Sequence, residues 1–280
     1  MRFTGASLGG RTFTLSIVRT DPEVLISSRD SAGIFVDFDG TLSHVVDVPS
    51  RARPAAGATE VLDSLAETFA LVAIVSGRGT RELMEWLGPK LEIWGVHGAE
   101  RAQAGEVHLV EELRPYVPVL ERARAEAEDA LSDDVFDGCL VEDKGVVIAL
   151  HHRMATNPQA PDRLRGLADL LAREHGLVRT DARMAFELRP PVDISKGSVV
   201  LKRVRELNLS AAAFLGDDLV DLAAFDALDE LESEGRDVFR VAIASDEAPG
   251  ELLERADLVI DGVEGAVGWL SDLARRAAAG

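Results

Sequence analysis

The sequence predicts an α/β protein: a Rossmann-like parallel-sheet core with a smaller α+β domain inserted into it. The chain has 280 residues, a length that suits two domains or one domain with a large insertion. From residue 33 onward, short apolar runs rich in β-forming residues alternate with amphipathic helical stretches, the pattern of a parallel sheet covered by helices. Hairpins and helices interrupt this alternation in the middle of the chain, after which it resumes.

The first part of the core is predicted to follow an N-terminal extension. Residues 1–30 mix Arg, Thr, Gly and Ser with isolated apolar positions, and we expect them to be loosely ordered. The apolar spacing after them predicts a strand, a helix, a buried strand, a short helix that Gly88 and Pro89 end, and a third strand. These elements are Gly33–Val36, residues 58–69, Leu71–Val75, Arg81–Leu87 and Leu91–Val96.

A different pattern fills the middle of the chain. A charged helix precedes two strands joined by a turn, and a second helix precedes two shorter strands: Tyr116–Leu131, Gly138–Glu142, Val146–Arg153, Asp162–His175, Leu177–Thr180 and Met184–Leu188. The alternation of helices and strands then returns at Gly197–Leu207, Ala211–Leu215, Leu219–Leu228, Val238–Ala244 and Leu258–Ile260, before a last helix. We therefore divide the chain into an extension (1–30), a first core segment (31–112), an inserted domain (113–188) and a second core segment (189–280).

Composition excludes several classes of function. The 30 Lys and Arg residues against 49 Asp and Glu give a formal net charge of −19, which repels nucleic acid and anionic membranes as general partners. The longest apolar run, Phe69–Val75, is far shorter than the roughly 18 residues of a membrane span, and the first thirty residues lack the apolar block of a secretory signal. Cys139 is the only cysteine, so an intrachain disulfide is impossible, and we expect a cytoplasmic protein.

Two carboxylates follow the first predicted strand. Asp37 and Asp39 are two residues apart, which puts both side chains on one side at the carboxyl end of the strand, where open α/β sheets bind ligands. Two like charges this close favour a cation between them. A simple turn after a strand is the plainer alternative. An EF-hand loop is a poorer one, since its remaining oxygen ligands and its terminal Glu are missing.

Two further patterns offer positive or hydrogen-bond-donating groups. Ser76 ends the second buried strand and precedes Gly77-Arg78-Gly79, a loop that can donate hydrogen bonds to a phosphate, although a helix N-cap explains the Ser equally well. Lys196 stands at a predicted helix start, where the helix dipole disfavours a cation, so that a Lys there needs a local anion. A solvated surface Lys is the plainer alternative for that residue taken alone.

The fourth pattern is Gly216-Asp217-Asp218 with Asp221, again after an apolar strand. Carboxylates from two strand ends of one sheet can converge on a hard cation such as Mg²⁺, which prefers oxygen ligands in an octahedron. Acidic residues that cap a helix N-terminus are the alternative. All four patterns fall at the same predicted edge of the sheet.

In this order, the patterns resemble the four motifs of the haloacid dehalogenase superfamily of phosphohydrolases. They match as Asp37-x-Asp39-x-Thr41, Ser76, Lys196 and Gly216-Asp217-Asp218-x-x-Asp221, and the resemblance extends over residues 33–262. Shorter runs resemble the trehalose-6-phosphate phosphatase family, in which the insertion is a cap domain: Asp37–Leu42, Val75–Arg78, Gly95–Glu100, Val141–Gly145, His151–Arg153 and Glu187–Pro191. The fourth motif departs from that family at Val220 and Leu222, where the family usually has Thr and Glu.

The resemblance implies Mg²⁺-dependent hydrolysis of trehalose 6-phosphate. It makes Asp37 the nucleophile that forms an aspartyl-phosphate, and Asp39 the general acid and base. It assigns Ser76 and Lys196 to the binding of the phosphoryl oxygens. The remaining site residues are metal ligands (Asp37, Asp217 and the backbone carbonyl of Asp39), their supports (Asp218 and Asp221), cap residues for sugar hydroxyls (Glu142, Lys144 and Glu187), and Phe38 and Arg78 beside the substrate.

Two other functions stay open at this point. The nearer one is another cap-bearing sugar-phosphate phosphatase, or a phosphomutase, of the same superfamily. The more distant one is a degenerate, non-catalytic regulatory protein. A trehalose-phosphate synthase is the protein partner that the resemblance suggests, and no residue in the sequence identifies a surface for it.

Overall fold

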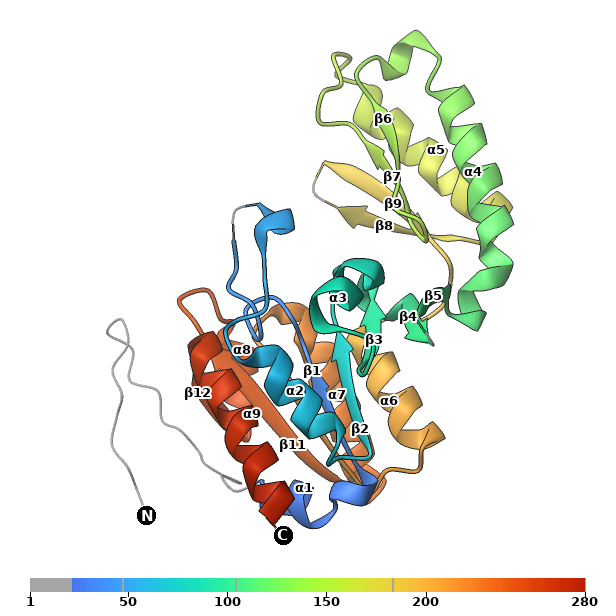
Figure 1. Cartoon of the computed structure of the whole chain (residues 1–280). Helices are drawn as coiled ribbons and strands as arrows, with labels where there is room; N and C mark the ends of the chain where they lie inside the picture. The colour runs from blue at the N-terminus through green and yellow to red at the C-terminus, as the bar shows by residue number, and fades with distance from the viewer. Residues whose placement is uncertain (1–21, 47, 104, 183, 280) are drawn as a thin grey trace. The chain divides into compact units, whose positions relative to one another are not determined.

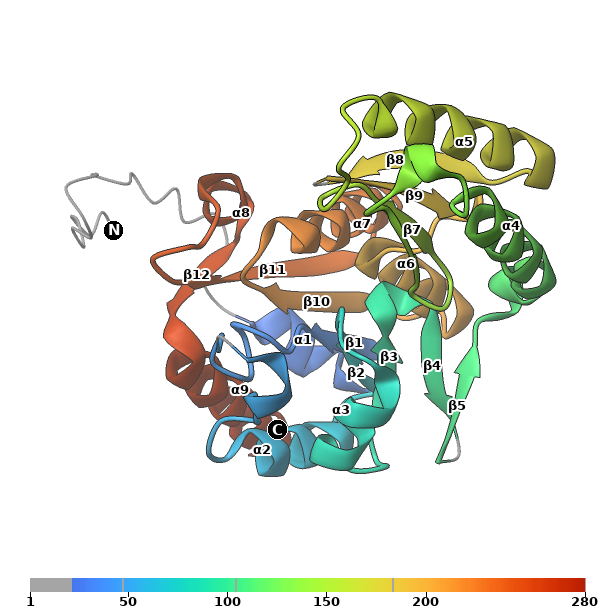
Figure 2. The ribbon, with the colours of Figure 1, turned by 90° about the horizontal axis from the view of Figure 1, so that it is seen from above.

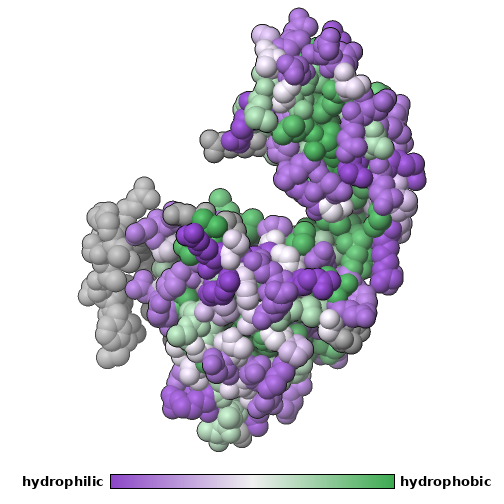
Figure 3. All heavy atoms as spheres, turned by 45° about the horizontal axis from the view of Figure 1, so that its top comes forward, coloured by the Kyte–Doolittle hydropathy of each residue, from purple (hydrophilic) through white to green (hydrophobic). Residues whose placement is uncertain are grey.

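The computed structural model describes residues 22–46, 48–103, 105–182 and 184–279. The chain divides into two compact units. Of the described residues, the first unit holds those from Pro22 to His108 together with those from Ile194 onward, and the second unit lies within Leu109–Asp193. Within the described residues, no helix combines the length and the apolar character that a membrane span requires. Polar residues cover most of the face drawn in Figure 3.

An eight-stranded sheet forms the centre of the first unit, with the strand order β12-β11-β10-β1-β2-β3-β4-β5. The strands from β12 to β3 run parallel, and β4 pairs antiparallel with β3. Their bounds are β1 (Ala32–Val36), β2 (Leu71–Val75), β3 (Glu92–Gly95), β4 (Glu100–Gln103), β5 (Glu106–Leu109), β10 (Ala211–Gly216), β11 (Asp237–Ala244) and β12 (Leu258–Asp261). Because the chain leaves β1 toward β2 and later returns on its other side with β10, a ligand crevice is expected at the carboxyl end of β1.

Helices cover both faces of this sheet (Figures 1 and 2). Figure 2 shows α2, α3 and α9 on one face and α6 and α7 on the other. The helices of this unit are α1 (Glu23–Ser27), α2 (Ala58–Ala66), α3 (Thr80–Leu87), α6 (Lys196–Glu206), α7 (Leu222–Ser233), α8 (Gly250–Arg255) and α9 (Gly262–Ala279), with short 3₁₀ turns at Arg29–Ser31, Pro49–Arg51, Val96–Gly98 and Leu219–Asp221. Because helices cover both faces, every residue of β1 and β2 is buried, and both strands are apolar throughout.

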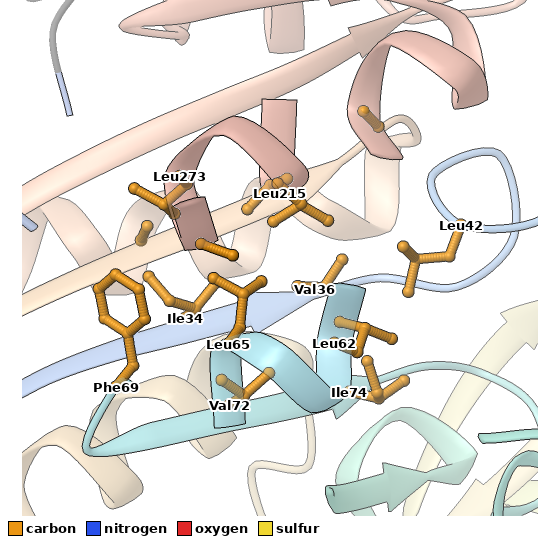
Figure 4. Close-up of a cluster of buried hydrophobic side chains, with 14 of the residues drawn as sticks. Ile34, Val36, Leu42, Leu62, Leu65, Phe69, Val72, Ile74, Leu215 and Leu273 are labelled. Carbon is orange, nitrogen blue, oxygen red and sulfur yellow. The ribbon is translucent and has the colours of Figure 1, made fainter. Parts of the chain in front are cut away.

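Alternate residues of the central strands pack against the helices of the first face. Figure 4 shows Ile34 and Val36 of β1 beside Leu62 and Leu65 of α2, with Leu215 of β10 close by. These side chains have almost no exposed surface. The site at the strand ends is therefore built on a rigid, close-packed support.

The N-terminal prediction is wrong for its last residues. We expected a loosely ordered extension through residue 30, but α1 and the turn after it are regular, and Leu25 and Ile26 are buried in the core. A five-residue helix is too short to show helical periodicity in the sequence, and its burial comes from tertiary packing. Residues 1–21 lie outside the described residues. The neighbouring strands β4 and β5 were also not predicted, because their residues are mostly polar.

The second unit is an antiparallel sheet with two helices. Its strand order is β6-β7-β9-β8, and its bounds are β6 (Leu140–Asp143), β7 (Ile148–His151), β8 (Val178–Ala182), β9 (Ala185–Arg189), α4 (Val117–Ala130) and α5 (Ala160–His175), with 3₁₀ turns at Glu111–Tyr116 and Asp134–Phe136. Leu150 and Phe186 pack with both helices in one core. Because side chains alternate along a strand, Glu142, Ala149 and Glu187 form a row on the other face of the sheet.

Candidate active site

The parallel register brings the first and fourth motifs together. Val36 pairs with Leu215, and the Asp37 N–H donates to the Leu215 carbonyl at 2.9 Å, so β1 and β10 end side by side. Asp37 and Asp217 follow these two strands directly. Residues 180 positions apart in the sequence thus meet at one edge of the sheet, as the motif positions predicted.

Lys196 binds two carboxylates. Its Nζ donates at 2.6 Å to Oδ1 of Asp37 and at 2.6 Å to Oδ1 of Asp221, and only 3% of its side chain is exposed. A capping box between Ser195 and Ser198 begins α6 at this position. Burial alone would lower the pKa of Lys196, but the charges of Asp37 and Asp221 raise it above its usual value. The anion that a Lys at a helix start requires is therefore present, and the surface-Lys alternative is wrong.

Asp221 shapes the loop after β10. Its Oδ2 accepts hydrogen bonds from the N–H groups of Asp217 and Asp218, each at 3.0 Å, while its Oδ1 is held by Lys196. The side chain is fully buried. Both of its oxygens are engaged, so Asp221 positions Lys196 and the loop. Asp218 itself is exposed and caps the following turn through a 2.6 Å bond from the Leu219 N–H.

An acidic cluster at the strand ends fits a metal ion. Carboxylate oxygens of Asp37, Asp217 and Asp221 lie within 4.8 Å of one another. Oδ1 of Asp217 is buried and has no hydrogen-bond partner among the described residues. Burial, followed by the charge of Asp221, raises the pKa of Asp217 to about 7, and burial raises the pKa of Asp37 well above its ordinary value. These three carboxylates offer only oxygen ligands, and their negative charges repel one another. Such a site suits a hard cation.

Gly40 makes room for this cluster. Its φ is +75°, and a Cβ at this position would lie 1.8 Å from Oδ2 of Asp217. Only glycine accommodates both the left-handed backbone and this close approach. A turn does follow β1, as the simpler interpretation of Asp37 and Asp39 expected. In this turn, Gly40 lies directly against the Asp217 carboxylate.

Asp39 lies apart from the acidic cluster. Arg78 holds it in a bidentate pair, with Nε 2.7 Å from Oδ2 and Nη2 2.8 Å from Oδ1. The Arg78 guanidinium also lies over the rings of Phe38 (5.6 Å) and Trp86 (5.2 Å). The Phe38 side chain is fully buried in the core, so only its backbone can face a ligand. The pairing of Arg78 with Asp39 was not predicted, because neither residue's neighbours in the sequence indicate it.

Two buried hydroxyls complete this edge of the sheet. Ser76 is 1% exposed, and its Oγ accepts a 3.3 Å bond from the Arg78 N–H, which leaves its own proton to donate. Oγ1 of Thr41 is buried without a hydrogen-bond partner in the described part of the chain. Thr41 was not among the expected site residues, although its place in the first motif was a signal for it.

The three expected cap residues come together on the second unit. Nζ of Lys144 donates to Oε1 of Glu187 at 3.1 Å and lies 3.9 Å from Oε2 of Glu142. Arg189 also donates to Glu187, and Nε2 of His151 is 2.7 Å from Oε2 of Glu142. Burial opposes the shift, but hydrogen bonds from Lys144 and Arg189 keep the pKa of Glu187 below its ordinary value. The result is a polar, charge-balanced face with many hydrogen-bonding groups.

Comparisons with known proteins identify the family of the chain. The family model for trehalose-phosphatase matches residues 35–251. Trehalose-phosphate phosphatases of Mycobacterium marinum and Mycobacterium leprae are 38% and 36% identical to the chain in alignments of 205 and 217 residues. These alignments cover 70% and 72% of this chain and 51% and 49% of the relatives. The chain thus spans about half the length of the curated relatives that it matches.

Solved structures share the fold. A trehalose-6-phosphate phosphatase of Aspergillus fumigatus superposes with a TM-score of 0.71 at 23% identity, covering 91% of this chain and 98% of that one. The C-terminal domain of a trehalose synthase regulatory protein of Candida albicans gives 0.54 at 14% identity, covering 92% and 99%. The predicted haloacid dehalogenase type of α/β fold, with a parallel-sheet core, is confirmed. The chain belongs to the trehalose-phosphatase family.

Proposed function

We propose that this chain hydrolyses trehalose 6-phosphate to trehalose and phosphate. One observation carries the proposal: Lys196 holds the buried carboxylate of Asp37 beside an Asp217 oxygen that no group in the described residues hydrogen-bonds. A nucleophile, a fixed positive charge and a cation site therefore share one sheet edge, which phosphoryl transfer requires. Membership in the trehalose-phosphatase family supports the choice of substrate.

Asp37 carries the covalent step of the proposed reaction. Because Lys196 holds Oδ1, Oδ2 is the oxygen that attacks phosphorus in line. The bond from phosphorus to the sugar oxygen breaks, and an aspartyl-phosphate forms. Water then attacks this phosphorus, releases phosphate and restores Asp37.

Asp39 moves the protons. It protonates the departing sugar oxygen, and later takes a proton from the attacking water. Both of its oxygens accept hydrogen bonds from Arg78, and opening this pair would free both of them for proton transfer. An incoming phosphoryl group is a competing anion for the same guanidinium, which gives a physical reason for the pair to open.

Positive charge and hydrogen-bond donors stabilise the transition state. Lys196 and the Ser76 hydroxyl act on the phosphoryl oxygens. A Mg²⁺ ion bound by Asp37, Asp217 and the Asp39 carbonyl would supply further positive charge to orient the phosphoryl group.

The cluster of Glu142, Lys144 and Glu187 is proposed to bind the sugar that lacks the phosphate. A disaccharide offers many hydroxyls and little apolar surface, so charged hydrogen-bond partners are the suitable recognition groups. We expect Lys144→Ala to reduce kcat/KM for trehalose 6-phosphate by about a hundredfold more than for p-nitrophenyl phosphate. Equal losses on both esters would contradict this assignment. Lys90→Ala, an exposed Lys that also pairs with two acids, is the matched control.

Phosphate release tests the function itself. The wild-type chain is expected to release phosphate from trehalose 6-phosphate much faster than from glucose 6-phosphate, to stop with chelator, and to be inactive as Asp37→Asn. A preference for a different sugar phosphate would replace the substrate, and an isomerised product would indicate a phosphomutase. No release from any ester would favour a regulatory protein.

We also propose a cytoplasmic location, on the basis of the single cysteine. A direct binding measurement would test whether a trehalose-phosphate synthase is a partner.

A further inference from the structure

A turn with unusual backbone angles follows β3. Val96 and His97 take φ angles of 49° and 56°, in the left-handed region. This conformation is uncommon for residues with a Cβ and a genuine outlier for a β-branched residue such as Val. Two such residues in succession persist only where surrounding contacts hold them, and outliers of this kind concentrate at functional sites. The turn lies in residues Gly95–Glu100, and no step of the proposed reaction involves these residues.

Hydrogen bonds hold the turn on the loop of the second motif. The Val96 N–H donates to the Arg78 carbonyl, and the His97 N–H donates to the Ser76 carbonyl, each at 2.8 Å. The Ser76 N–H in turn donates to the Trp94 carbonyl of the preceding strand at 3.0 Å, so three backbone hydrogen bonds join the two loops. The position of His97 is therefore coupled to the position of Ser76.

The other end of the turn lies on the start of α6. Gly98 has a φ of 107°, and a Cβ there would be 2.5 Å from Cγ2 of Val199 and 3.3 Å from the Ser195 carbonyl oxygen. Ser195 directly precedes Lys196. The turn thus contacts both loops that supply groups for the phosphoryl oxygens, and this fixes where the His97 side chain stands relative to them.

The His97 ring packs against the backbone of Gly77, the residue that follows Ser76. A Cβ on Gly77 would lie 2.7 Å from Cε1 and 2.9 Å from Nε2 of the ring, so the imidazole rests directly on the Gly77 backbone. The His97 side chain is exposed, whereas Ser76 is buried. A ligand whose phosphoryl group reached Ser76 would place its next atoms at the level of this ring.

We propose that His97 is a specificity residue that hydrogen-bonds a hydroxyl of the sugar ring carrying the phosphate. The inference rests on the proposed function. Ser76 and Lys196 already serve the phosphoryl oxygens from buried positions, so an exposed ring further out meets the next part of the ligand. A neutral imidazole donates at one nitrogen and accepts at the other, which matches a hydroxyl group. The strained backbone maintains the ring in this place.

A glycine substitution separates recognition from structural support. His97→Gly removes the ring and also suits a positive φ, so it should not lower the melting temperature. We expect it to reduce kcat/KM for trehalose 6-phosphate about tenfold more than for p-nitrophenyl phosphate, mainly through KM. His97→Asn, which tolerates the left-handed region and keeps a polar group, should recover part of the loss. His108→Asn on β5 is the control, with no difference between the two esters.

Two results would overturn the inference. One is an equal loss on both esters, and the other is a loss accompanied by a lower melting temperature, since either would make the ring a support for the turn alone. Failure of the proposed substrate is distinguishable: if the wild type prefers another sugar phosphate, the same comparison is made on that ester. If it hydrolyses none, calorimetric titration with trehalose 6-phosphate replaces the kinetics, and equal or absent binding to wild type and His97→Gly overturns the assignment.

Discussion

At the scale of single residues, Asp221 supports two parts of the site at once. It holds Lys196 with one oxygen and the backbone of Asp217 and Asp218 with the other. Asp221→Asn keeps the shape of the side chain but leaves a buried ammonium with one anion instead of two. Breaking a buried ion pair costs about 3–5 kcal/mol, so we expect a loss of stability of that order and a large loss of kcat.

Urea unfolding and steady-state kinetics on the same preparation check this expectation. Asp226→Asn on α7 is a matched control, because that acid is exposed and pairs with Arg255 at 2.8 Å. Surface pairs of this kind contribute about 0–1 kcal/mol. An Asp221→Asn protein as stable and active as the control would contradict the role assigned to Asp221.

Gly40 gives a second prediction at this scale. Gly40→Ala would force a Cβ into Oδ2 of Asp217 on a left-handed backbone, so the acidic cluster has to rearrange. We expect weaker Mg²⁺ binding by calorimetry and loss of phosphate release. Gly166→Ala in α5, where a Cβ meets open space, is the control and should stabilise its helix by about 1 kcal/mol. Unchanged Mg²⁺ affinity in Gly40→Ala would refute the close-approach argument.

At the scale of elements, the N-terminus of α6 controls where Lys196 stands. The Ser195 side chain accepts from the Ser198 N–H, and the Ser198 hydroxyl accepts from the Ser195 N–H, each at 3.0 Å. Ser195→Ala removes this cap, and we expect a stability loss of about 1 kcal/mol together with a several-fold lower kcat. Asp133→Ala removes a comparable cap from the second unit. We expect Asp133→Ala to lower stability by a similar amount without lowering the hydrolysis of p-nitrophenyl phosphate. If both variants lowered kcat equally, the link between the cap and Lys196 would be contradicted.

Elements differed in how far the sequence predicted them. The strands β1, β2 and β10 were predictable because strands covered on both faces are continuously apolar, and their ends located the four motifs. The need of Lys196 for an anion was predictable from the helix dipole, but the choice of Asp221 depends on tertiary packing. The left-handed angle at Val96 has no sequence signal, since a β-branched residue rarely adopts it. The burial of α1 has none either, because five residues carry no periodicity.

At the scale of the whole molecule, the net charge of −19 includes an acidic cluster whose protonation makes stability depend on pH. Without metal, three carboxylates of the cluster face one ammonium. The pKa of Asp217 is raised by burial and by Asp221 to about 7, from an ordinary value of 3.8. The folded chain therefore binds this proton more tightly than the unfolded chain, so stability is lost as pH rises between these two values.

Magnesium should reverse this loss. Because the metal needs ionised carboxylates, we expect it to raise the melting temperature more at pH 8 than at pH 5.5. Thermal unfolding with Mg²⁺ and with chelator at both pH values checks this. Asp217→Asn should reduce both the pH dependence and the Mg²⁺ effect. A Mg²⁺ effect equal at the two pH values would show that the cluster does not take the ion.

The neighbouring positions of β1 and β10 have a consequence for how the molecule is made. The ribosome completes β1 long before β10, with the entire second unit synthesised between them. Until β10 emerges and inserts beside β1, Asp217 cannot lie near Asp37. Contacts between residues so distant in the chain form slowly, and an incomplete nascent chain exposes an apolar strand edge. Catalytic competence would therefore report that synthesis of the chain has passed β10 and that its two core segments have joined.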